Sequence, residues 1–324
     1  MTINLTKNQI KQWREKGYVI VSNLIEPQLL DKCITFMNHK YPNPENACKD
    51  FGSEDGELEF PSGKIIDRIT IHHNIISGVK KLLNSDNILL LQSDAWGKGG
   101  YNKISNMSNM SNMSNQDQRM HMDYGNNTFL HPSDWNSPET VANIIYLSDT
   151  QITGGGTSVV PRLGKDDPLY KTPYINMPGQ NRYRFYNDRS TAEKYMSTIS
   201  LEMKQFRERL YNREIITNPK IGDILFYRLD LWHRGTPVNI GKVRNVINLL
   251  WKKKDCFWIN TWNKGWTKKM YGGVIEKLFT QMSPIQRSVI GIPTPGDKYW
   301  NKEKLKLLKA RYPDIDMSPY LSKL

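Results

Sequence analysis

From about residue 86 onward the chain consists of short apolar runs separated by turn-forming residues, and this pattern limits the fold more than any other feature. The runs are NILLLQSDAWGK, DQRMHMDYG, TVANIIYLSD, GTSVVP, GDILFYRLDLWHRG and VRNVINLLWKK. Runs of this length, bounded by Gly, Pro, Asn and Asp, are typical of β-strands. Helical sequence interrupts them clearly only around Thr191 to Tyr211. The pattern therefore predicts an antiparallel sandwich or barrel rather than alternating strands and helices.

Local capping signals define the elements that precede this region. Thr6 is a suitable N-cap for a helix that would end at Gly17, because a threonine hydroxyl accepts from the first helical amides and glycine tolerates the left-handed C-cap conformation. A strand from Tyr18 to Ser22 follows, and Pro27 fits the first turn of a second helix. A further helix is expected near residues 74–84.

Length and composition favour one elaborated globular domain. The chain has 324 residues, and its hydrophobic fraction of 38% makes disorder unlikely for most of it. We expect residues 1–85 to form helical and strand elements that pack on the core. Residues 86–250 should form the β core, and residues 251–324 a basic, aromatic, partly helical extension of the same domain.

Targeting signals and cysteine frameworks are not evident. No apolar run approaches the roughly 18–20 residues needed to span a bilayer, and the opening MTINLTKNQIKQW has no apolar signal core. We therefore expect a cytoplasmic protein without a membrane partner. Cys33, Cys48 and Cys256 are far apart and form no CxxC pair, so they are expected to be free thiols.

The net charge of +13 raises the question of a polyanionic partner. The excess is spread along the chain, as a biased overall composition would also produce, so charge alone argues weakly for nucleic acid. Residues 251–271 are the exception, because they interleave lysines with aromatic side chains. This mixture suits stacking on bases and contact with phosphates. A nucleic-acid binder, or an oxygenase acting on nucleic acid, is therefore the alternative function.

Residues 105–115, SNMSNMSNMSN, repeat Ser, Asn and Met every three positions. Such a segment has little apolar area and strong turn chemistry, which favours a flexible surface insertion. A Cu(I) site formed by Met107, Met110 and Met113 is the competing interpretation, since thioethers suit soft metals.

His121 and Asp123 are the first candidate metal ligands. In a strand, residues two apart project to the same face, so both side chains would point to one place while Met120 and Met122 pack behind them. Non-haem Fe(II) sites use two histidines and one carboxylate, with three coordination positions left open. Among the other histidines, His233 differs because DILFYRLDLWHRGTPVN carries it to the end of an apolar strand. A lone histidine is more often a satisfied polar contact.

Arg244 changes this balance. It lies eleven positions after His233, at the start of the apolar run RNVINLLW. A permanently charged guanidinium near a barrel interior needs an anion, and the distal carboxylate of a dicarboxylate would be a bidentate partner. The hydroxyl of Thr236 could add a hydrogen bond. Alone, Arg244 could equally form a surface salt bridge.

Together these residues resemble a known family. His121, Asp123, His233 and Arg244 match the H-x-D…H…R pattern of the Fe(II)/2-oxoglutarate dioxygenases, and LTKNQIKQWREKGYVIVSNLIEPQLLD, GGGTSVVPRLGK and WHRGTPVNIGKVRNVINL are similar to elements of the phytanoyl-CoA dioxygenase branch. The resemblance covers roughly residues 5–250. It implies a jelly-roll or cupin-like double-stranded β-helix, mainly β with flanking helices.

The resemblance also implies the cofactors. Fe(II) would be bound by His121, Asp123 and His233, and 2-oxoglutarate would be anchored by Arg244. With O₂, the expected reaction is oxidative decarboxylation to succinate and CO₂ coupled to hydroxylation of a C–H bond. Because Asp123 is present, the halogenase variant that lacks this carboxylate is not expected. The repeat insertion departs from the family pattern, and so do Arg162 and Leu163, which stand where the family usually has Gly and Ser before a His.

The glycine run GGGTSVVPRLGKDD could suggest a phosphate loop. However, no Ser or Thr follows Lys165, and no GxGxxG spacing occurs. We expect Gly154 to Gly156 to form a tight turn into a core strand, with Thr157 facing the cofactor.

The substrate is expected to be a small organic molecule selected by loops. The candidate loops are residues 43–64, 124–140 and 162–190, which include Tyr124, Trp135, Arg162, Arg182, Tyr183 and Arg184. Their basic and aromatic side chains favour an anionic molecule, although ordinary loop packing explains them equally well.

We predict that residues 105–115 are dispensable. Replacing residues 106–114 with a short Gly-Ser link should preserve melting temperature and iron content, because loop-closure entropy changes slowly with length. The cut must stay clear of Gln116, since a one-residue slip would turn His121 and Asp123 away from the metal. A large fall in either measurement, or a demonstrated Cu(I) site on the three methionines, would contradict this prediction.

Overall fold

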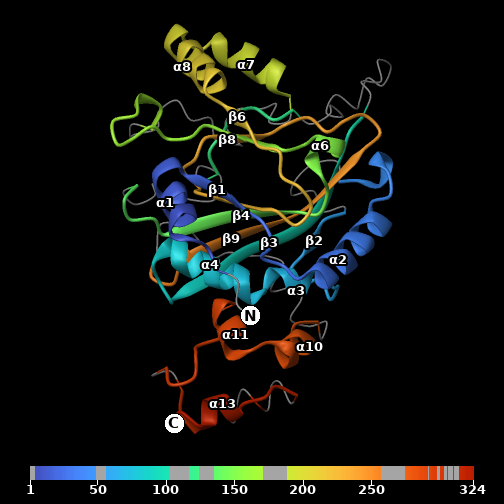
Figure 1. Cartoon of the computed structure of the whole chain (residues 1–324), viewed down its shortest axis with the longest axis vertical. Helices are drawn as coiled ribbons and strands as arrows, with labels where there is room; N and C mark the ends of the chain where they lie inside the picture. Colours follow the sequence, from blue (N-terminus) through green and yellow to red (C-terminus); the bar gives the residue numbers. More distant parts are fainter. Residues whose placement is uncertain are drawn as a thin grey trace.

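Two antiparallel sheets form the centre of the molecule, and helices cover its outside (Figure 1). The computed structural model describes residues 4–48, 56–101, 117–123, 135–170, 188–256, 274–290, 292–297, 300–302, 305, 309 and 314–324. The repeat insertion at 105–115 lies outside these residues, as do the loop residues Tyr124, Arg182, Tyr183 and Arg184.

The large sheet has the strand order β1-β7-β4-β9-β3-β2. Its strands are β1 (Tyr18–Val21), β2 (Leu58–Glu59), β3 (Ile88–Gly99), β4 (Thr140–Tyr146), β7 (Ile224–Tyr227) and β9 (Val243–Lys253). The register of β3 and β9 pairs Lys98 with Arg244. Directly opposed residues share a face of the sheet, so these two cationic side chains project to the same side.

The small sheet has the order β6-β5-β8. Its strands are β5 (Thr157–Val159), β6 (Ile215–Ile216) and β8 (His233–Gly235). Residues 117–123 run beside β8 and meet it in a backbone bridge between His121 and His233. The two antiparallel sheets with their flanking helices confirm the expected mainly-β, double-stranded β-helix architecture.

Helices occupy three regions around the sheets. Those that contact the large sheet or its connections are α1 (Lys7–Lys16), α2 (Pro27–Lys40), α3 (Asp67–Thr70), α4 (His73–Leu83), α6 (Thr150–Thr153) and α11 (Pro284–Val289). At the top of Figure 1, above β6 and β8, lie α7 (Arg189–Ser197) and α8 (Leu201–Asn212). The lower end of the molecule holds α10 (Val274–Gln281) and α13 (Ser318–Leu321). Short 3-10 turns occur at Pro44–Asn46 and Pro168–Tyr170.

The N-terminal helix begins and ends as its local sequence predicts. The Thr6 hydroxyl accepts from the Gln9 amide, and the Gln9 side chain accepts from the Thr6 amide, which completes a capping box. Gly17 ends the helix in the left-handed conformation at φ 90°. The strand and second helix expected after it are also present as β1 and α2.

The helical stretch expected around Thr191 to Tyr211 is divided into two helices. Thr198 ends α7, and the Ser200 side chain accepts from the Met203 amide at 3.0 Å to begin α8. Serine favours such an N-cap over a position inside a helix, because its hydroxyl competes for backbone amides. The chain therefore turns back on itself and forms a helical hairpin.

The C-terminal region packs on the rest of the chain. Leu278, Trp300 and Tyr320 belong to the same buried apolar cluster as the sheet residues. The Gln286 amide group donates to the Ile71 carbonyl at 2.7 Å, which ties α11 to the end of α3. The boundaries expected at residues 85 and 250 stay a prediction.

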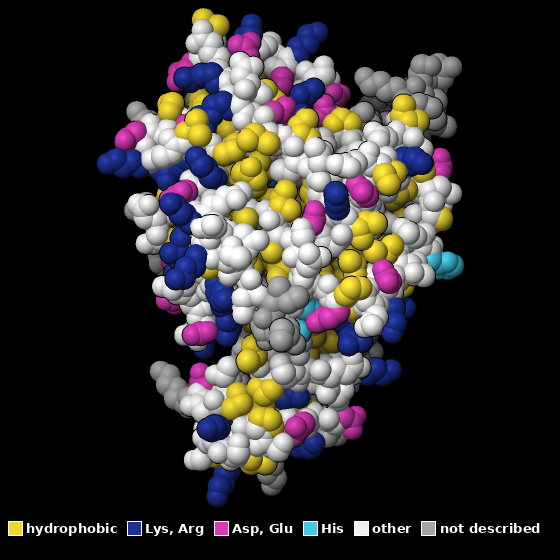
Figure 2. Space-filling view, in the orientation of Figure 1, with side chains coloured by type: hydrophobic (Ala, Val, Ile, Leu, Met, Phe, Trp, Pro, Cys, Tyr) yellow, Lys and Arg dark blue, Asp and Glu magenta, His cyan; other side chains and the backbone are white. Residues whose placement is uncertain are grey.

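The structure bears on the expectations for the cysteines, for membrane-spanning helices and for the distribution of charge. Cys33, Cys48 and Cys256 are buried and form no disulfide bond, as expected. No helix in the described part of the chain is both long and apolar enough to cross a membrane. Figure 2 shows Lys and Arg side chains spread over the visible face with Asp and Glu among them. Within the basic segment, Lys252 is buried and donates to the Cys256 carbonyl at 2.8 Å, while residues 257–271 lie outside the described residues.

The glycine run forms the expected turn into β5. Gly154 and Gly155 have positive φ angles of 68° and 72°. A Cβ atom on Gly156 would lie 2.4 Å from the Thr217 carbonyl oxygen. Only glycine allows this close approach of two backbone segments, which places β5 against its neighbour.

We predict that Gly156→Ala destabilises the protein by about 1–3 kcal/mol, because the added methyl meets rigid backbone rather than a movable side chain. Chemical denaturation of the variant measures the change. The control is Gly164→Asn, at a position with φ 88° and nothing within 4 Å of an added Cβ. Asparagine tolerates this conformation, so the control should change little. Equal stability of Gly156→Ala and the parent would contradict the prediction.

Candidate metal and anion site

The two histidines of the candidate site meet through their backbones. The His121 amide donates to the His233 carbonyl, and the His233 amide donates to the His121 carbonyl, both at 2.9 Å. The ring centroids lie 4.4 Å apart. Both side chains are buried. A single backbone pair therefore brings together residues that are far apart in the sequence.

The segment around His121 differs from the regular strand that was expected. Continuing the antiparallel register would place Asp123 opposite Leu231. Instead, the Asp123 amide donates to the Leu229 carbonyl at 3.1 Å, because a turn in which the Leu231 amide donates to the Arg228 carbonyl intervenes. Met120 and Met122 are buried, as expected. The His and Asp side chains converge because the chain bends at Asp123, not because a regular strand continues through it.

His233 also differs from its expected position. The run GDILFYRLDLWHRG is not one strand, since β7 ends at Tyr227 and β8 begins at His233. Between them Arg228 and Asp230 form a buried ion pair with bonds of 2.8 and 2.9 Å. This pair stabilises the turn in place of ladder hydrogen bonds.

Each histidine presents the same ring nitrogen to the site. His121 Nδ1 lies 3.0 Å from the Arg119 carbonyl, and His233 Nδ1 lies 3.0 Å from the Leu231 carbonyl. A carbonyl only accepts, so Nδ1 carries the proton in both rings and Nε2 is left as a metal-ligating lone pair. This is the tautomer that a metal centre requires.

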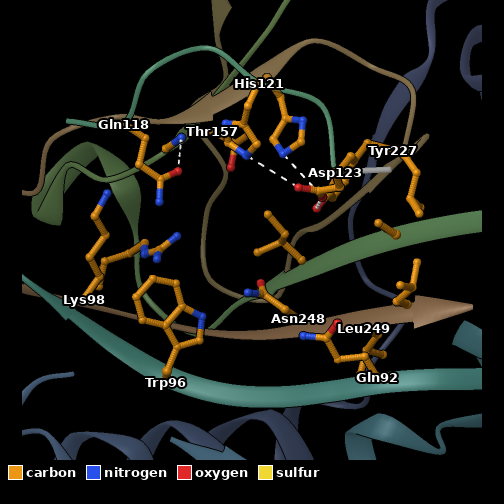
Figure 3. Close-up of a pocket in the computed structure, with 17 residues that line it drawn as sticks. Gln92, Trp96, Lys98, Gln118, His121, Asp123, Thr157, Tyr227, Asn248 and Leu249 are labelled. Carbon is orange, nitrogen blue, oxygen red and sulfur yellow. Dashed lines mark hydrogen bonds and ion pairs between the residues drawn. The ribbon is translucent and has the colours of Figure 1, made fainter. Parts of the chain in front are cut away.

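Asp123 completes the triad. Its Oδ1 lies 3.5 Å from His121 Nε2, and its Oδ2 lies 3.5 Å from His233 Nε2 (Figure 3). The ligand atoms of the three residues all lie within 4.8 Å of one another. The Tyr227 hydroxyl donates to Asp123 Oδ2 at 2.8 Å, which fixes the orientation of the carboxylate.

Burial and mutual charge perturb this group of side chains. Burial lowers the pKa of His121 to about 4, and the neighbouring His233 adds to the effect. Burial alone would raise the pKa of Asp123, but the two histidines hold it well below its usual range. Burial opposes protonation of His233, whereas Asp123 raises its pKa. A carboxylate that stays ionised beside a neutral imidazole is a ready set of donors for a cation.

A cavity of about 140 Å³ opens beside the triad. Residues from both sheets line it: Gln92, Trp96, Lys98, Gln118, His121, Asp123, Ala142, Ile144, Thr157, Tyr227, Leu229, His233, Gly235, Arg244, Asn248, Leu249 and Leu250. Asp123 is the acidic member of this lining, and Lys98 and Arg244 are its two long cationic side chains. Figure 3 shows Lys98 and Asp123 at opposite sides of the cavity, so the lining is polarised.

Arg244 is a buried cation that has no acidic partner among the described residues. Its guanidinium carbon lies 5.0 Å from the centre of the Trp96 ring, and its Nε is buried without a hydrogen-bond partner. Burial lowers its pKa, and contact with Tyr146 opposes that effect. A buried guanidinium that lacks an acidic partner and has an Nε donor without an acceptor is suited to bind an anionic ligand.

The two threonines expected near the cofactor differ in their surroundings. Thr157 lines the cavity, and its Oγ1 lies 2.7 Å from the Tyr146 hydroxyl. The Thr236 hydroxyl instead donates to the Gly156 carbonyl at 2.8 Å, and Thr236 is not among the cavity-lining residues. Its carbonyl accepts from Lys98 Nζ at 3.0 Å.

Several residues that line the cavity were not predicted from the sequence. Lys98, Trp96 and Gln92 alternate along β3, and this period of two within an apolar run was an available sign of an inward face. Tyr227 and Asn248 had no comparable local sign. The loop residue Arg162, by contrast, lies 4.5 Å from the Trp135 ring centre, as ordinary loop packing would have it.

A second group, Glu26, His72 and His73, also has ligand atoms within 4.8 Å of one another. Here His72 Nδ1 accepts from the Asn74 amide at 3.3 Å, which leaves the proton on Nε2. Nε2 lies 2.6 Å from Glu26 Oε2 and donates to it. His72 therefore caps a helix and forms a buried hydrogen bond with Glu26. Both of its ring nitrogens are used, so the ring has no free lone pair for a metal.

Two solved structures illustrate what this chain is similar to. The crystal structure of SnoK, a non-heme alpha-ketoglutarate-dependent carbocyclase from nogalamycin biosynthesis, aligns with a TM-score of 0.54 and 14% identity, over 82% of this chain and 90% of that one. The iron-bound crystal structure of HygX from Streptomyces hygroscopicus aligns with a TM-score of 0.49 and 12% identity, over 79% and 90% of the two chains. No curated protein sequence matches significantly.

A match to a sequence model of a protein family identifies the family of this chain. The model of the phytanoyl-CoA dioxygenase (PhyH) family matches residues 13–246, which is well over half of the chain and includes the whole triad and Arg244. The chain belongs to the phytanoyl-CoA dioxygenase family.

Proposed function

We propose that the protein is an Fe(II)- and 2-oxoglutarate-dependent oxygenase that hydroxylates an unactivated C–H bond of a small organic substrate. One observation carries the proposal. The His121, Asp123 and His233 triad and the buried guanidinium of Arg244 line a single cavity. A metal and a dicarboxylate would each find a suitable partner there, at separate places on its wall.

The donor set fits Fe(II). Two imidazole Nε2 atoms and one ionised carboxylate match the 2-His-1-carboxylate arrangement of non-haem iron oxygenases, which leaves coordination positions open. The hydrogen bonds from both Nδ1 atoms to backbone carbonyls, and from Tyr227 to Asp123, are the outer contacts that orient such ligands.

The cationic end fits 2-oxoglutarate. Its 2-oxo acid group would chelate the metal, and its distal carboxylate would reach Arg244. Lys98, opposite Arg244 in the β3–β9 register, adds a second buried positive charge at this end. The unpartnered Nε of Arg244 would gain an acceptor, which removes the cost of a buried donor without a hydrogen bond.

The cofactors supply the oxidising chemistry, and the chain supplies binding, orientation and exclusion of water. Bound iron, 2-oxoglutarate and O₂ would provide an oxidant able to remove hydrogen from a C–H bond, with succinate and CO₂ as by-products. Ile144, Leu229 and Leu250 give the cavity apolar walls that keep bulk water away from this step.

Two amide side chains in the cavity lining indicate which substrate groups could bind there. Gln92 and Asn248 line the cavity, and Asn248 Oδ1 is buried without a partner. An acceptor in this position favours a substrate group that donates a hydrogen bond, such as a hydroxyl or an amine. The expectation of an anionic substrate was based on Arg162 and on loop residues that lie outside the described part of the chain, so it stays a prediction. SnoK is named a carbocyclase, so product analysis has to accompany any assay.

We predict that Asp123→Ala abolishes iron binding and turnover, because two imidazoles without the carboxylate hold Fe(II) weakly. Metal analysis after anaerobic loading and succinate release measure the two effects. The exposed carboxylate variant Asp166→Ala is the control and should retain both properties. Parent-like decarboxylation of 2-oxoglutarate by Asp123→Ala would show that the metal site has been misassigned.

We predict that Arg244→Met weakens 2-oxoglutarate binding by well over tenfold while iron content is unchanged. Losing the charged partner of a buried carboxylate typically costs about 2–5 kcal/mol. Calorimetry on the metal-loaded protein measures the affinity, and pyruvate, which lacks the distal carboxylate, serves as the control ligand. The parent should prefer 2-oxoglutarate strongly, and the variant should bind both alike. An unchanged preference would remove Arg244 from the site.

A further inference from the structure

The backbone around Met120 has an unusual set of partners. His121 uses its own amide and carbonyl in the pair with His233, so the Met120 amide and carbonyl point away from β8. Two side chains of α8 meet them. The Met120 amide donates to the Tyr211 hydroxyl at 2.9 Å, and the Met120 carbonyl accepts from Arg207 Nη2 at 2.9 Å.

Glu193 of α7 holds both of these side chains. Its carboxylate accepts from Nε and Nη2 of Arg207 at 2.5 Å each, and from the Tyr211 hydroxyl at 2.5 Å. Arg207 is 2% exposed, so its charge is neutralised in the interior and its geometry is rigid. The helical hairpin thus presents a fixed donor and a fixed acceptor to the backbone of Met120.

These contacts lead directly to the metal ligand. The Met120 amide and the Arg119 carbonyl belong to one planar peptide unit. Tyr211 accepts from one side of this unit, and His121 Nδ1 donates to the other side at 3.0 Å. A tilt of this peptide plane would disturb both hydrogen bonds and would turn the imidazole.

The next peptide unit has the same arrangement. Its carbonyl, from Met120, accepts from Arg207, and its amide, from His121, donates to the His233 carbonyl. Both peptide units that flank Met120, the residue before His121, are therefore held on one side by the metal-site contacts and on the other side by α8.

The residues on either side of His233 also contact this hairpin. The Trp232 ring packs edge-on against Phe206 of α8 at a centroid distance of 5.8 Å. The Arg234 guanidinium lies 5.8 Å from the Tyr211 ring centre and pairs with Glu214 at 2.7 Å. Tyr211 of α8 therefore contacts neighbours of both histidines, Met120 and Arg234.

We propose that Tyr211 and Arg207 are positioning residues of the metal centre, which hold the two peptide units that precede His121 and so set the orientation of its ring. The proposal rests on the proposed function, because it takes the triad as the metal site. The substitution Tyr211→Phe tests it, since the ring and its contacts with the arginines remain and only the hydroxyl is lost.

We predict that Tyr211→Phe binds Co(II), used as a spectroscopic substitute for Fe(II), about 10- to 100-fold more weakly than the parent, as is usual when an outer partner of a metal-ligating histidine is lost. Competition with a chelator measures the affinity, and the Co(II) absorption spectrum reports altered ligand geometry. In metal-free protein, hydrogen exchange of a peptide spanning residues 117–123 should be faster than in the parent.

The matched control is Arg213→Gln. Arg213 ends α8 and pairs with Asp167 at 2.7 and 2.8 Å, but it does not touch the metal segment. It should lower the melting temperature and leave Co(II) affinity and spectrum unchanged. If Tyr211→Phe cannot be purified, Arg207→Lys keeps the charge beside Glu193, loses the Nη2 donor to the Met120 carbonyl, and should weaken Co(II) binding in the same way.

The outcomes separate this inference from the proposed function. If the parent binds Co(II) at the triad and Tyr211→Phe or Arg207→Lys binds it equally well with an identical spectrum, the positioning role is wrong and the metal site stands. If the parent itself shows no Co(II) binding that depends on Asp123, the proposed function fails, and with it the basis of the inference.

Discussion

The backbone pair between His121 and His233 is the interaction on which the site depends. It joins the irregular segment 117–123 to the small sheet and places two imidazole rings 4.4 Å apart. The register then breaks, and the bend at Asp123 turns its carboxylate toward both Nε2 atoms. Because hydrogen bonds from Nδ1 to backbone carbonyls fix both rings, the ligand geometry is set by main chain that the sheet already holds rigid.

The second constraint is electrostatic and concerns the buried charge of Arg244. A buried arginine without an acidic partner costs free energy on the order of several kcal/mol, and an ordinary core would exclude it. Arg244 lies at the cationic end of the cavity with Lys98 opposite it, whereas Asp123 lies at the other side. The two ends of the cavity are complementary to a metal-bound dianion. The proposed mode of cofactor binding rests on this polarised cavity.

Features that depend on interactions between residues close in the sequence could be predicted, whereas most features that depend on distant residues could not. The capping box at Thr6 and the left-handed Gly17 depend on neighbouring residues, and both were predicted correctly. The triad was identified because a His-x-Asp spacing and a distant histidine and arginine match a family pattern. The route to the triad was wrong in detail, since a regular strand was expected where a turn at residues 228–231 shifts the register.

The contributions that were missed are long-range. Tyr227 reaches Asp123 from a neighbouring strand, and Tyr211 reaches Met120 from a helical hairpin about ninety positions away. Nothing in the local sequence of either tyrosine distinguishes it from a core aromatic residue. Such partners become visible only when the fold brings their hydroxyl groups to the Asp123 carboxylate or to the Met120 amide.

The central claim is that the metal triad and Arg244 act as one binding site, and linkage between the two ligands tests it most directly. Calorimetric titration of 2-oxoglutarate into metal-free protein and into protein loaded with Mn(II), which does not turn over, measures that linkage. The account predicts at least tenfold tighter binding in the loaded protein, because the 2-oxo acid gains a metal ligand while Arg244 holds the distal carboxylate. Equal affinity in the two titrations would contradict it.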